Sequence, residues 1–484
     1  MDSLPLLSLL FLTLPAGALL AWLWPHPQAA RVIALGFALF DLAVALAVVA
    51  VFDPGQSGFQ LVERHAWIPS LNIHYAVGVD GLSVLFLPAT VLLFIGVILA
   101  SWNSVHTLPR LYYSLLLLLE TATLGAFCAL DTMLFFLFWE LALVPLYFLV
   151  SLWGLGANRR HAAMKYTLVM LGSGLPLLFG FIVLAGPNLI FDLPTLLAAP
   201  PTRDVQMLVF LMLFAGFAAK IPVVPLHTWL PLISLEGPAA VAALLTGIKL
   251  GAYGLIRFAA PLAPAAAQEL HWLLAGLGVI AILFGAFAAL AQTNLRRMLG
   301  YASLSHVGLV LLAVATFSLQ GLQGAILLLL NFVIAAGGLF LLVSALHHRT
   351  GSTDVALLGG AAKTMPLLAV FFLLFGFAGM GIPGTLGFPA ELLILLAVFQ
   401  THAGAGLAAL TGMVLGAAYF LTLYRRAFFG PVVRPEVAQA QDLLPRERWV
   451  ALIFALLVIG FGVFPALLLD LIRPAAEVWA ARFG

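Results

Sequence analysis

The sequence is divided into about fourteen apolar runs, each close to the length that a helix needs to cross a bilayer. A transmembrane helix requires about 20 mainly apolar residues, and breaks rich in charge, proline or glycine separate the runs. The chain of 484 residues is 64% hydrophobic and only 8% charged, whereas a soluble domain carries about 25% charged residues. Such a chain lacks the polar surface to stay dispersed in water. The sequence therefore predicts an all-α integral membrane protein and excludes a soluble enzyme, a nucleic-acid binder and a disordered scaffold.

Two of the expected spans contain residues that interrupt a helix. The seventh contains Pro222 and Pro225, and the twelfth contains Pro383, Gly384 and Pro389. A broken helix exposes backbone polar groups at membrane depth, which is tolerated only inside protein or around a cavity. Because the breaks lie five spans apart, we expect two inverted five-helix repeats, spans 4–8 and 9–13, with broken helices 7 and 12. The expected spans are 5–23, 31–52, 81–101, 112–130, 132–151, 165–186, 206–223, 238–259, 271–292, 301–317, 322–345, 366–399, 406–426 and 448–470.

The expected spans predict how the chain is divided, and the positions of Lys and Arg between them predict its orientation. Lys and Arg favour cytoplasmic loops, and about fourteen of the 21 lie on one side of the expected spans. We therefore expect both termini to be periplasmic, in a bacterial inner membrane. The long polar stretches 53–80 and 427–447 are expected to be loops. The expected segments are an N-terminal three-helix segment (1–111), the first repeat (112–260), the second repeat (261–430) and a C-terminal helix (431–484).

The sequence offers no residues for a cofactor or metal of its own. The single cysteine, Cys128, excludes disulfides, cysteine-ligated zinc and iron–sulfur clusters within the chain. Neither long loop carries a phosphate-binding glycine pattern or metal-ligand spacing. The formal net charge of +2 gives no electrostatic footprint for a nucleic acid.

Four ionisable side chains lie inside apolar runs, where each costs about 2.5–3.5 kcal/mol to insert. They are Glu140, Lys220, Lys249 and Glu391. Alone, Glu140 could be a neutral carboxyl that helps packing, and Lys220 could extend its ammonium to the membrane surface. Lys249 is flanked by apolar sequence on both sides and cannot reach either surface. Together, two carboxyls and two amines indicate a path for ions, because lysine can release its proton inside a protein whereas arginine stays charged.

Other polar residues in the spans have less specific interpretations. His227 and His306 could extend such a path, although a lone histidine on an apolar helix is as often a hydrogen-bonded packing residue. Asp41 and Glu120 also lie inside spans, and the sequence indicates no role for either.

Six short stretches combine these charges with glycine, proline and aromatic residues. They are Gly78-Val79-Asp80-Gly81-Leu82-Ser83, Phe138-Trp139-Glu140-Leu141, Lys220-Ile221-Pro222 with Pro225-Leu226-His227-Thr228-Trp229-Leu230-Pro231, Lys249 with Ala252-Tyr253-Gly254-Leu255, Tyr301 to Gly308, and Gly387-Phe388-Pro389-Ala390-Glu391. In this order they resemble the antiporter-like membrane subunits of respiratory complex I, over residues 65–430. The chain is most similar to the M-type members, because it leaves no room for the long lateral helix of the L-type members.

The resemblance implies a role for each buried charge. Glu140 and Lys220 would form an ion pair that responds to neighbouring subunits, Lys249 would be the central proton carrier, and Glu391 would exchange protons with the periplasm. His306 and His227 would be accessory relay residues. The chain departs from the family at two positions. Family members often have an acidic residue shortly before the position of Glu236, and this chain lacks it, so Glu236 could replace that acid. Several members have histidine at the position of Asn331. Both residues are therefore candidates for the accessory path.

The resemblance also implies partners. L- and N-type antiporter-like subunits would flank the chain, and NADH, FMN, iron–sulfur clusters and quinone would bind to partner subunits, whose redox chemistry drives proton movement. The alternative assemblies are a multisubunit cation/proton antiporter, a membrane-bound hydrogenase and a bicarbonate-uptake complex, which share the same path residues. A third interpretation is a membrane scaffold that transports nothing. The sequence leaves open whether Na⁺ can replace H⁺.

Overall fold

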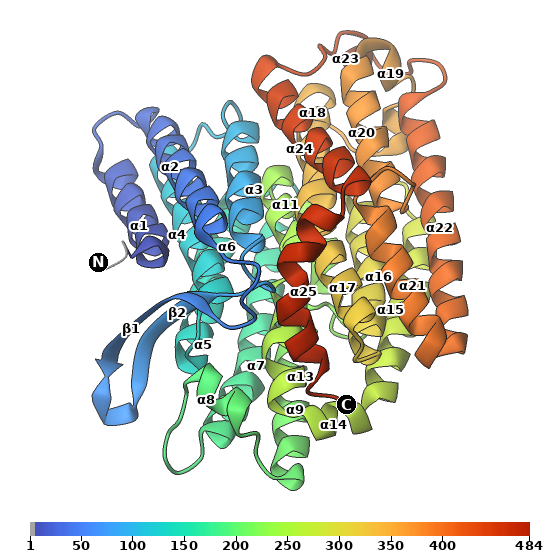
Figure 1. Cartoon of the computed structure of the whole chain (residues 1–484). Coiled ribbons are helices and arrows are strands. Elements are labelled where there is room, and N and C mark those ends of the chain that lie inside the picture. The colour runs from blue at the N-terminus through green and yellow to red at the C-terminus, as the bar shows by residue number, and fades with distance from the viewer. Residues whose placement is uncertain (1–4) are drawn as a thin grey trace.

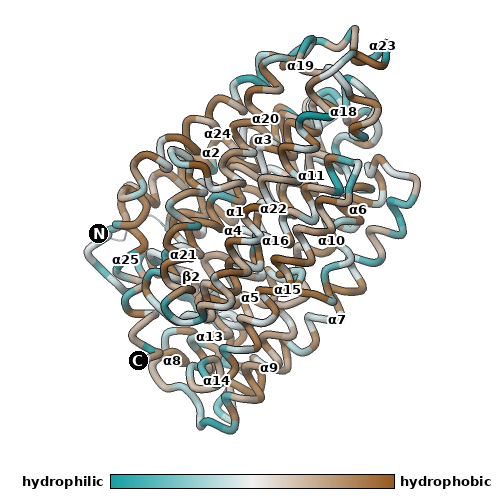
Figure 2. Tube along the Cα trace, turned by 90° about the vertical axis from the view of Figure 1, so that its right-hand side faces the viewer, coloured by the Kyte–Doolittle hydropathy of each residue, from teal (hydrophilic) through white to brown (hydrophobic). Residues whose placement is uncertain are grey.

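The computed structural model describes residues 5–484, most of which are helical. Long helices run side by side, with the N-terminal helices at one flank and α25 crossing the front (Figure 1). Figure 2 shows hydrophobic residues along the helices and hydrophilic residues gathered near their ends. Ten helices within 5–484 are long and apolar enough to cross a membrane, or eleven if the bent pair α24–α25 counts as one span. The chain is therefore a multi-pass membrane protein, as its composition predicts.

The N-terminal segment contains a β-hairpin that the sequence prediction missed. Strands β1 (Gln60–Ile68) and β2 (Ile73–Val79) pair antiparallel around the short helix η1 (Pro69–Leu71). Asn72 makes the turn in the left-handed conformation, with φ of 54°. β2 is held to the bundle because Leu130 donates its N–H to the Ala76 carbonyl at 2.8 Å. The expected loop over 53–80 is therefore wrong for residues 60–79, and the fold is not purely helical. The preceding and following helices are α1 (Leu6–Leu23), α2 (Ala29–Val51) and α3 (Phe86–Ala100).

The first group of central helices contains the expected interruption in the seventh run. α9 ends at Lys220, and α10 begins only at Trp229, after the prolines. Asp131 starts α5 by accepting the N–H groups of Met133 and Leu134 at 2.9 and 3.1 Å, as an N-cap residue does. The elements are α4 (Pro109–Cys128), α5 (Thr132–Leu141), α6 (Leu143–Trp153), α7 (Arg159–Ala185), α8 (Leu193–Ala198), α9 (Arg203–Lys220) and α10 (Trp229–Glu236).

The eighth run, expected as one helix over 238–259, is divided at Ile248 and Lys249. α11 (Ala239–Gly247) ends there, and α12 (Leu250–Gly254) passes into the π-helical segment η2 (Leu255–Ala259) and α13 (Ala260–Leu262). Glycines on both sides of the break lower helix propensity. A Cβ at Gly251 would lie 2.7 Å from the backbone nitrogen of Ile221. Only glycine allows this approach, which packs the break in the eighth run against the break in the seventh.

The second group repeats the pattern of an interrupted helix. α20 ends at Gly379 and α21 begins at Gly387, so the break expected in the twelfth run is present. The π-helical segment η3 (Phe332–Ala336) joins α17 to α18. The elements are α14 (Pro264–Glu269), α15 (His271–Leu290), α16 (Leu295–Ala315), α17 (Leu319–Asn331), α18 (Gly337–Thr350), η4 (Val355–Leu357), α19 (Ala361–Thr364), α20 (Pro366–Gly379), α21 (Gly387–Thr401) and α22 (Ala403–Phe428).

The C-terminal region differs from the single helix expected over 448–470. After α23 (Pro435–Ala438), α24 (Pro445–Val463) and α25 (Ala466–Ala480) meet at a bend of 68° next to Pro465. Arg482 near the C-terminus donates to the Leu197 carbonyl at 2.7 Å. Near the N-terminus, the Leu7 N–H donates to Glu63 at 2.9 Å. α1 thus begins beside the hairpin, and the chain ends beside α8.

Candidate functional site

Lys249 lies at the break between α11 and α12 and is 6% exposed. Its Nζ donates to Ser303 Oγ on α16 at 2.6 Å. Nζ also lies 5.3 Å from the ring centroid of Phe332. Among residues 5–484, no carboxylate comes within ion-pair distance of this ammonium. Lys249 is therefore a buried amine whose direct partner is a neutral hydroxyl.

A small cavity lies beside Lys220 and is lined by Ile248 and Leu250, the two chain neighbours of Lys249. It has a volume of about 50 Å³, and its lining includes Lys220, Thr123, Tyr166 and Ile248. A cavity needs about 10–15 Å³ to hold one water molecule. The space between the two interrupted helices is therefore large enough for water, and Ile248 directly precedes Lys249.

Lys220 and Glu140 do not form the direct ion pair that the resemblance implies. Lys220 Nζ lies over the ring of Trp139, 3.7 Å from its centroid, in a cation–π contact. Within the described chain, neither Lys220 Nζ nor Glu140 Oε1 has a hydrogen-bond partner. The Glu140 carboxyl packs against Gly174 of α7, where any larger side chain would overlap it. In this conformation the aromatic ring next to Glu140 takes the place of the expected carboxylate.

Glu391 lies in the second turn of α21, close to the second interruption. It is 2% exposed, and its Oε2 has no hydrogen-bond partner within 5–484. This oxygen contacts Gly381, which has a φ of +64° and no space for a side chain. The broken stretch between α20 and α21 therefore packs directly against a buried carboxyl.

His306 and Asn331 lie between Lys249 and Glu391. His306 follows Ser303 by three residues on α16, which places both on one helix face. Its Nδ1 is 2.8 Å from the Ala302 carbonyl, and its Nε2 is 2.6 Å from the Gly379 carbonyl at the end of α20. A neutral imidazole has one N–H, so it can donate to only one of these carbonyls at a time. Asn331 Nδ2 donates to the neighbouring Ala378 carbonyl at 3.1 Å.

Two other predicted residues lie outside this group. The ring of His227 packs edge-on against Phe284, with centroids 4.9 Å apart. Glu236 accepts the backbone N–H of Asn158 at 2.8 Å, just before α7 begins. Neither makes a hydrogen bond or ion pair with the four buried charges among the described residues. Glu236 therefore acts here as an acceptor for the end of a loop.

Sequence reasoning assigned no role to Ser303 or Trp139. Both lie in stretches that the sequence singles out, yet neither is ionisable. The available signal for Ser303 is its position one helical turn before His306. The available signal for Trp139 is its position next to Glu140. Their partners, Lys249 and Lys220, come from distant parts of the chain, and only the fold brings them together.

Interrupted helices inside a multi-pass bundle, each beside a buried charge, define the architecture of an ion transporter. The family model "NADH:quinone oxidoreductase/Mrp antiporter, TM" matches residues 129–416. The chain therefore belongs to the NADH:quinone oxidoreductase/Mrp antiporter transmembrane family, and the expected resemblance is confirmed.

Individual relatives match over nearly the whole chain. NADH-quinone oxidoreductase subunit M of Rhodobacter capsulatus is 37% identical, over 97% of this chain and 95% of the relative. NADH-ubiquinone oxidoreductase chain 4 of Chondrus crispus is 34% identical, over 90% and 89%. A chain of respiratory complex I from Thermus thermophilus with bound NADH superposes with a TM-score of 0.91 and 31% identity, over 99% of this chain and 100% of that one. A chain of the Mrp complex from a Dietzia species shares the fold, with a TM-score of 0.86 and 23% identity over 99% of each chain.

Proposed function

We propose that the chain is the M-type, proton-translocating membrane subunit of an NADH:quinone oxidoreductase in a bacterial inner membrane. The identity of 37% to a subunit M over 97% of the chain supports this assignment. The observation that carries the mechanism is the contact between Lys249 and Ser303 at a helix break. An ammonium held by a hydroxyl, without a carboxylate, can pass its proton on when its surroundings change.

The proton path we propose begins at Glu140 and Lys220 and passes through Lys249 and His306 to Glu391. The cavity beside Lys220 supports the first step, since it has room for water. The two carbonyls facing His306 support the later step, from Lys249 to Glu391, because a change of tautomer moves the N–H of His306 from Ala302 toward Gly379. His227, Glu236 and Asn331 remain accessory candidates, and Asn331 is supported best because it shares the end of α20 with His306.

The assembly we propose extends beyond this chain. The chain would cross the membrane fourteen times, as two inverted five-helix repeats with both termini in the periplasm. α1 begins beside the hairpin and the chain ends beside α8, which agrees with both termini lying on one side of the membrane. L- and N-type subunits would flank it, and NADH, FMN, iron–sulfur clusters and quinone would bind elsewhere in the complex.

The test compares wild type with Lys249→Ala in inverted membrane vesicles at matched assembly. NADH supplies the energy, and proton uptake and quinone reduction are followed together. We expect the variant to lose pumping together with coupled NADH oxidation. A variant that pumps like wild type would make Lys249 a structural residue and refute the path.

The fold shared with an Mrp complex supports a second candidate, a subunit of a cation/proton antiporter. In that case NADH would drive no pumping in either version. A Na⁺/H⁺ exchange signal that requires Lys249 would identify the antiporter.

A further inference from the structure

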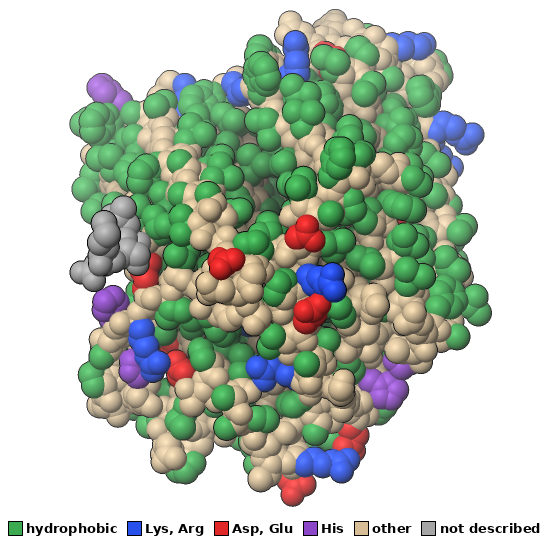
Figure 3. Space-filling model, in the orientation of Figure 1, with side chains coloured by type: hydrophobic (Ala, Val, Ile, Leu, Met, Phe, Trp, Pro, Cys, Tyr) green, Lys and Arg blue, Asp and Glu red, His purple; other side chains and the backbone are tan. Residues whose placement is uncertain are grey.

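Cavities follow one another along a groove on the outside of the molecule between α3 and α24, and Figure 3 shows this face. The groove contains three cavities in sequence. The first, of about 580 Å³, lies at the ends of the helices beside Asn103 and Arg446. The second, of about 20 Å³, is lined by Gly96 and Phe454. The third, of about 360 Å³, lies deeper, beside Leu92. Hydrophobic side chains cover most of the surrounding surface (Figure 3).

The deep cavity is lined by apolar side chains alone. α2 contributes Leu46, α3 contributes Leu85 and Leu92, and α24 contributes Leu457 and Phe461, over a floor formed by α17 and η3. Its volume of about 360 Å³ falls in the range of small-molecule sites, about 300–1,000 Å³. Because this cavity offers no polar partner, it fits a hydrocarbon chain.

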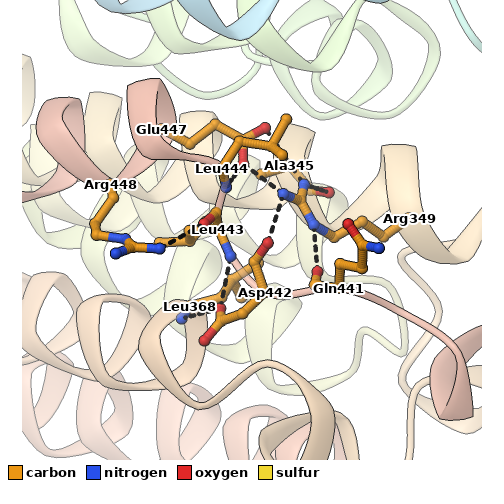
Figure 4. Close-up of polar contacts among 9 residues, drawn as sticks. All are labelled: Ala345, Arg349, Leu368, Gln441, Asp442, Leu443, Leu444, Glu447 and Arg448. Carbon is orange, nitrogen blue, oxygen red and sulfur yellow. Dashed lines mark hydrogen bonds and ion pairs between the residues drawn. The ribbon is translucent and has the colours of Figure 1, made fainter.

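Most charged groups at the outer end of the groove are already paired (Figure 4). Arg349 binds Glu447 at 2.5 Å and donates to the carbonyls of Gln441 and Asp442 at 2.7 and 3.1 Å. The Asp442 carboxylate accepts the N–H groups of Leu367 and Leu368 at the start of α20. These contacts fix the loop before α24, and the carboxylate of Glu447 balances the charge of Arg349.

Arg446, which lines the same outer cavity, is the exception. Within residues 5–484 it forms no ion pair, and its buried Nε has no hydrogen-bond partner. The nearby Glu436 is engaged by Arg434 at 2.9 Å. Arginine presents a planar fork of donors that matches a phosphate group. The outer end of the groove therefore has an unpaired cation suited to a phosphodiester.

The length of the groove agrees with that of a single lipid. From Ala100 at the outer cavity to Leu85 at the deep one, α3 rises about 22 Å at 1.5 Å per residue. One leaflet, including headgroups, measures about 20–22 Å. We propose that this groove binds a phospholipid, with its phosphate on Arg446 and one acyl chain in the apolar cavity between α2, α3 and α24.

The experiment uses the intact complex that contains this chain, reconstituted with phosphatidylglycerol bearing a diazirine in one acyl chain. After illumination, the labelled residues are located by mass spectrometry. We expect labelling over residues 85–92 and 453–461. Arg446→Gln removes the phosphate contact, and Leu457→Trp fills the deep cavity. Arg446→Gln should lower labelling of the groove about tenfold, the change expected when a charge-assisted hydrogen bond is lost. Leu457→Trp should also lower it, because the ring occupies the space proposed for the acyl chain.

Two control variants match these changes outside the groove. Arg448→Gln removes a neighbouring cation, and Leu456→Trp adds the same ring at a position that is 62% exposed. Both should label like wild type. Labelling no stronger than at Val414, a 70% exposed residue of α22, or labelling that both test variants leave unchanged, would overturn the proposal. So would capture of a neighbouring subunit, in place of lipid, by a photo-crosslinker attached at Ile453→Cys.

Discussion

Lys249 and Arg257 are two cations on one interrupted helical stretch, and both are 6% exposed. Their partners differ completely. Arg257 binds both oxygens of Asp80, with Nη1–Oδ2 at 2.7 Å, and its Nε donates to the Tyr253 hydroxyl at 3.1 Å. Among the described residues, the hydrogen-bond partner of the Lys249 ammonium is the Ser303 hydroxyl. Burial alone therefore does not distinguish the two sites, whereas the charge of the partner does.

The difference has a chemical meaning. A guanidinium bound by a carboxylate is neutralised in place, and arginine does not release its proton in proteins. This pair ties η2 to the stretch that follows β2. The Lys249 ammonium faces a hydroxyl, and no carboxylate of the described residues balances its charge. Loss of the proton therefore removes a charge that is costly to bury, whereas the Asp80 carboxylate balances the charge of Arg257. The first site is suited to holding the fold, and the second to moving a proton.

The largest effect is expected when each cation is replaced by the other type. Lys249→Arg keeps the charge but cannot deprotonate, so we expect NADH-driven pumping to fall at least about tenfold with assembly intact. Arg257→Lys keeps a cation beside Asp80, so pumping per assembled complex should stay within about twofold of wild type. Proton uptake by inverted vesicles at matched assembly measures both. Normal pumping by Lys249→Arg would show that deprotonation at this position is unnecessary.

The second prediction concerns stability. Arg257→Ala leaves Asp80 buried and unpaired, which costs about 3–5 kcal/mol of unfolding free energy. Denaturant-induced unfolding in detergent measures the loss. The exchanged pair Asp80→Arg with Arg257→Asp should recover part of it. Equal stability of the single variant and wild type would contradict a structural role for the pair.

A smaller effect is expected at the hydroxyl partner of Lys249. Ser303→Ala removes a hydrogen bond to a charged group, worth about 1.5–3 kcal/mol. Quinone-coupled pumping should fall about tenfold, which corresponds to the lower end of that energy, while Ser303→Thr, which keeps the hydroxyl, should stay close to wild type. Turnover of the two variants at matched assembly makes the comparison. A deficit shared by both variants would point to packing and not to the hydroxyl.

The smallest effect is expected at Glu236. Its contact with the Asn158 N–H predicts that Glu236→Gln, which keeps an acceptor oxygen, lowers stability by about 0.5–1.5 kcal/mol and leaves pumping unchanged. Thermal unfolding and vesicle pumping measure the two quantities. If Glu236→Gln lost pumping while its stability stayed normal, Glu236 would belong to the proton path.

Several features could be predicted because they depend on local sequence. Pro222 with Pro225, and Pro383 with Gly384, lie where helices end, so the breaks after Lys220 and Gly379 could be located. Pro389 was wrongly expected to be part of the second break, because it lies inside α21. The break at Lys249 was missed because the glycines beside it do not mark a helix end by themselves. The requirement for glycine comes from the close approach of Gly251 to the backbone of Ile221, which depends on the fold. The hairpin at 60–79 was missed because its two strands lie in a polar stretch between apolar runs, where no apolar run of transmembrane length marks an element.

By itself, the sequence determined that this chain is a multi-pass membrane protein with four costly charges and two interrupted helices, since apolar length, proline and ionisable groups act locally. Only the tertiary structure decided which group each charge meets: Ser303 for Lys249, Trp139 for Lys220 and Asp80 for Arg257. These partners come from other elements of the fold, α16, α5 and the stretch after β2, up to 177 residues away. In an apolar interior, the partner that packing supplies sets whether a charge is fixed in place or free to lose its proton.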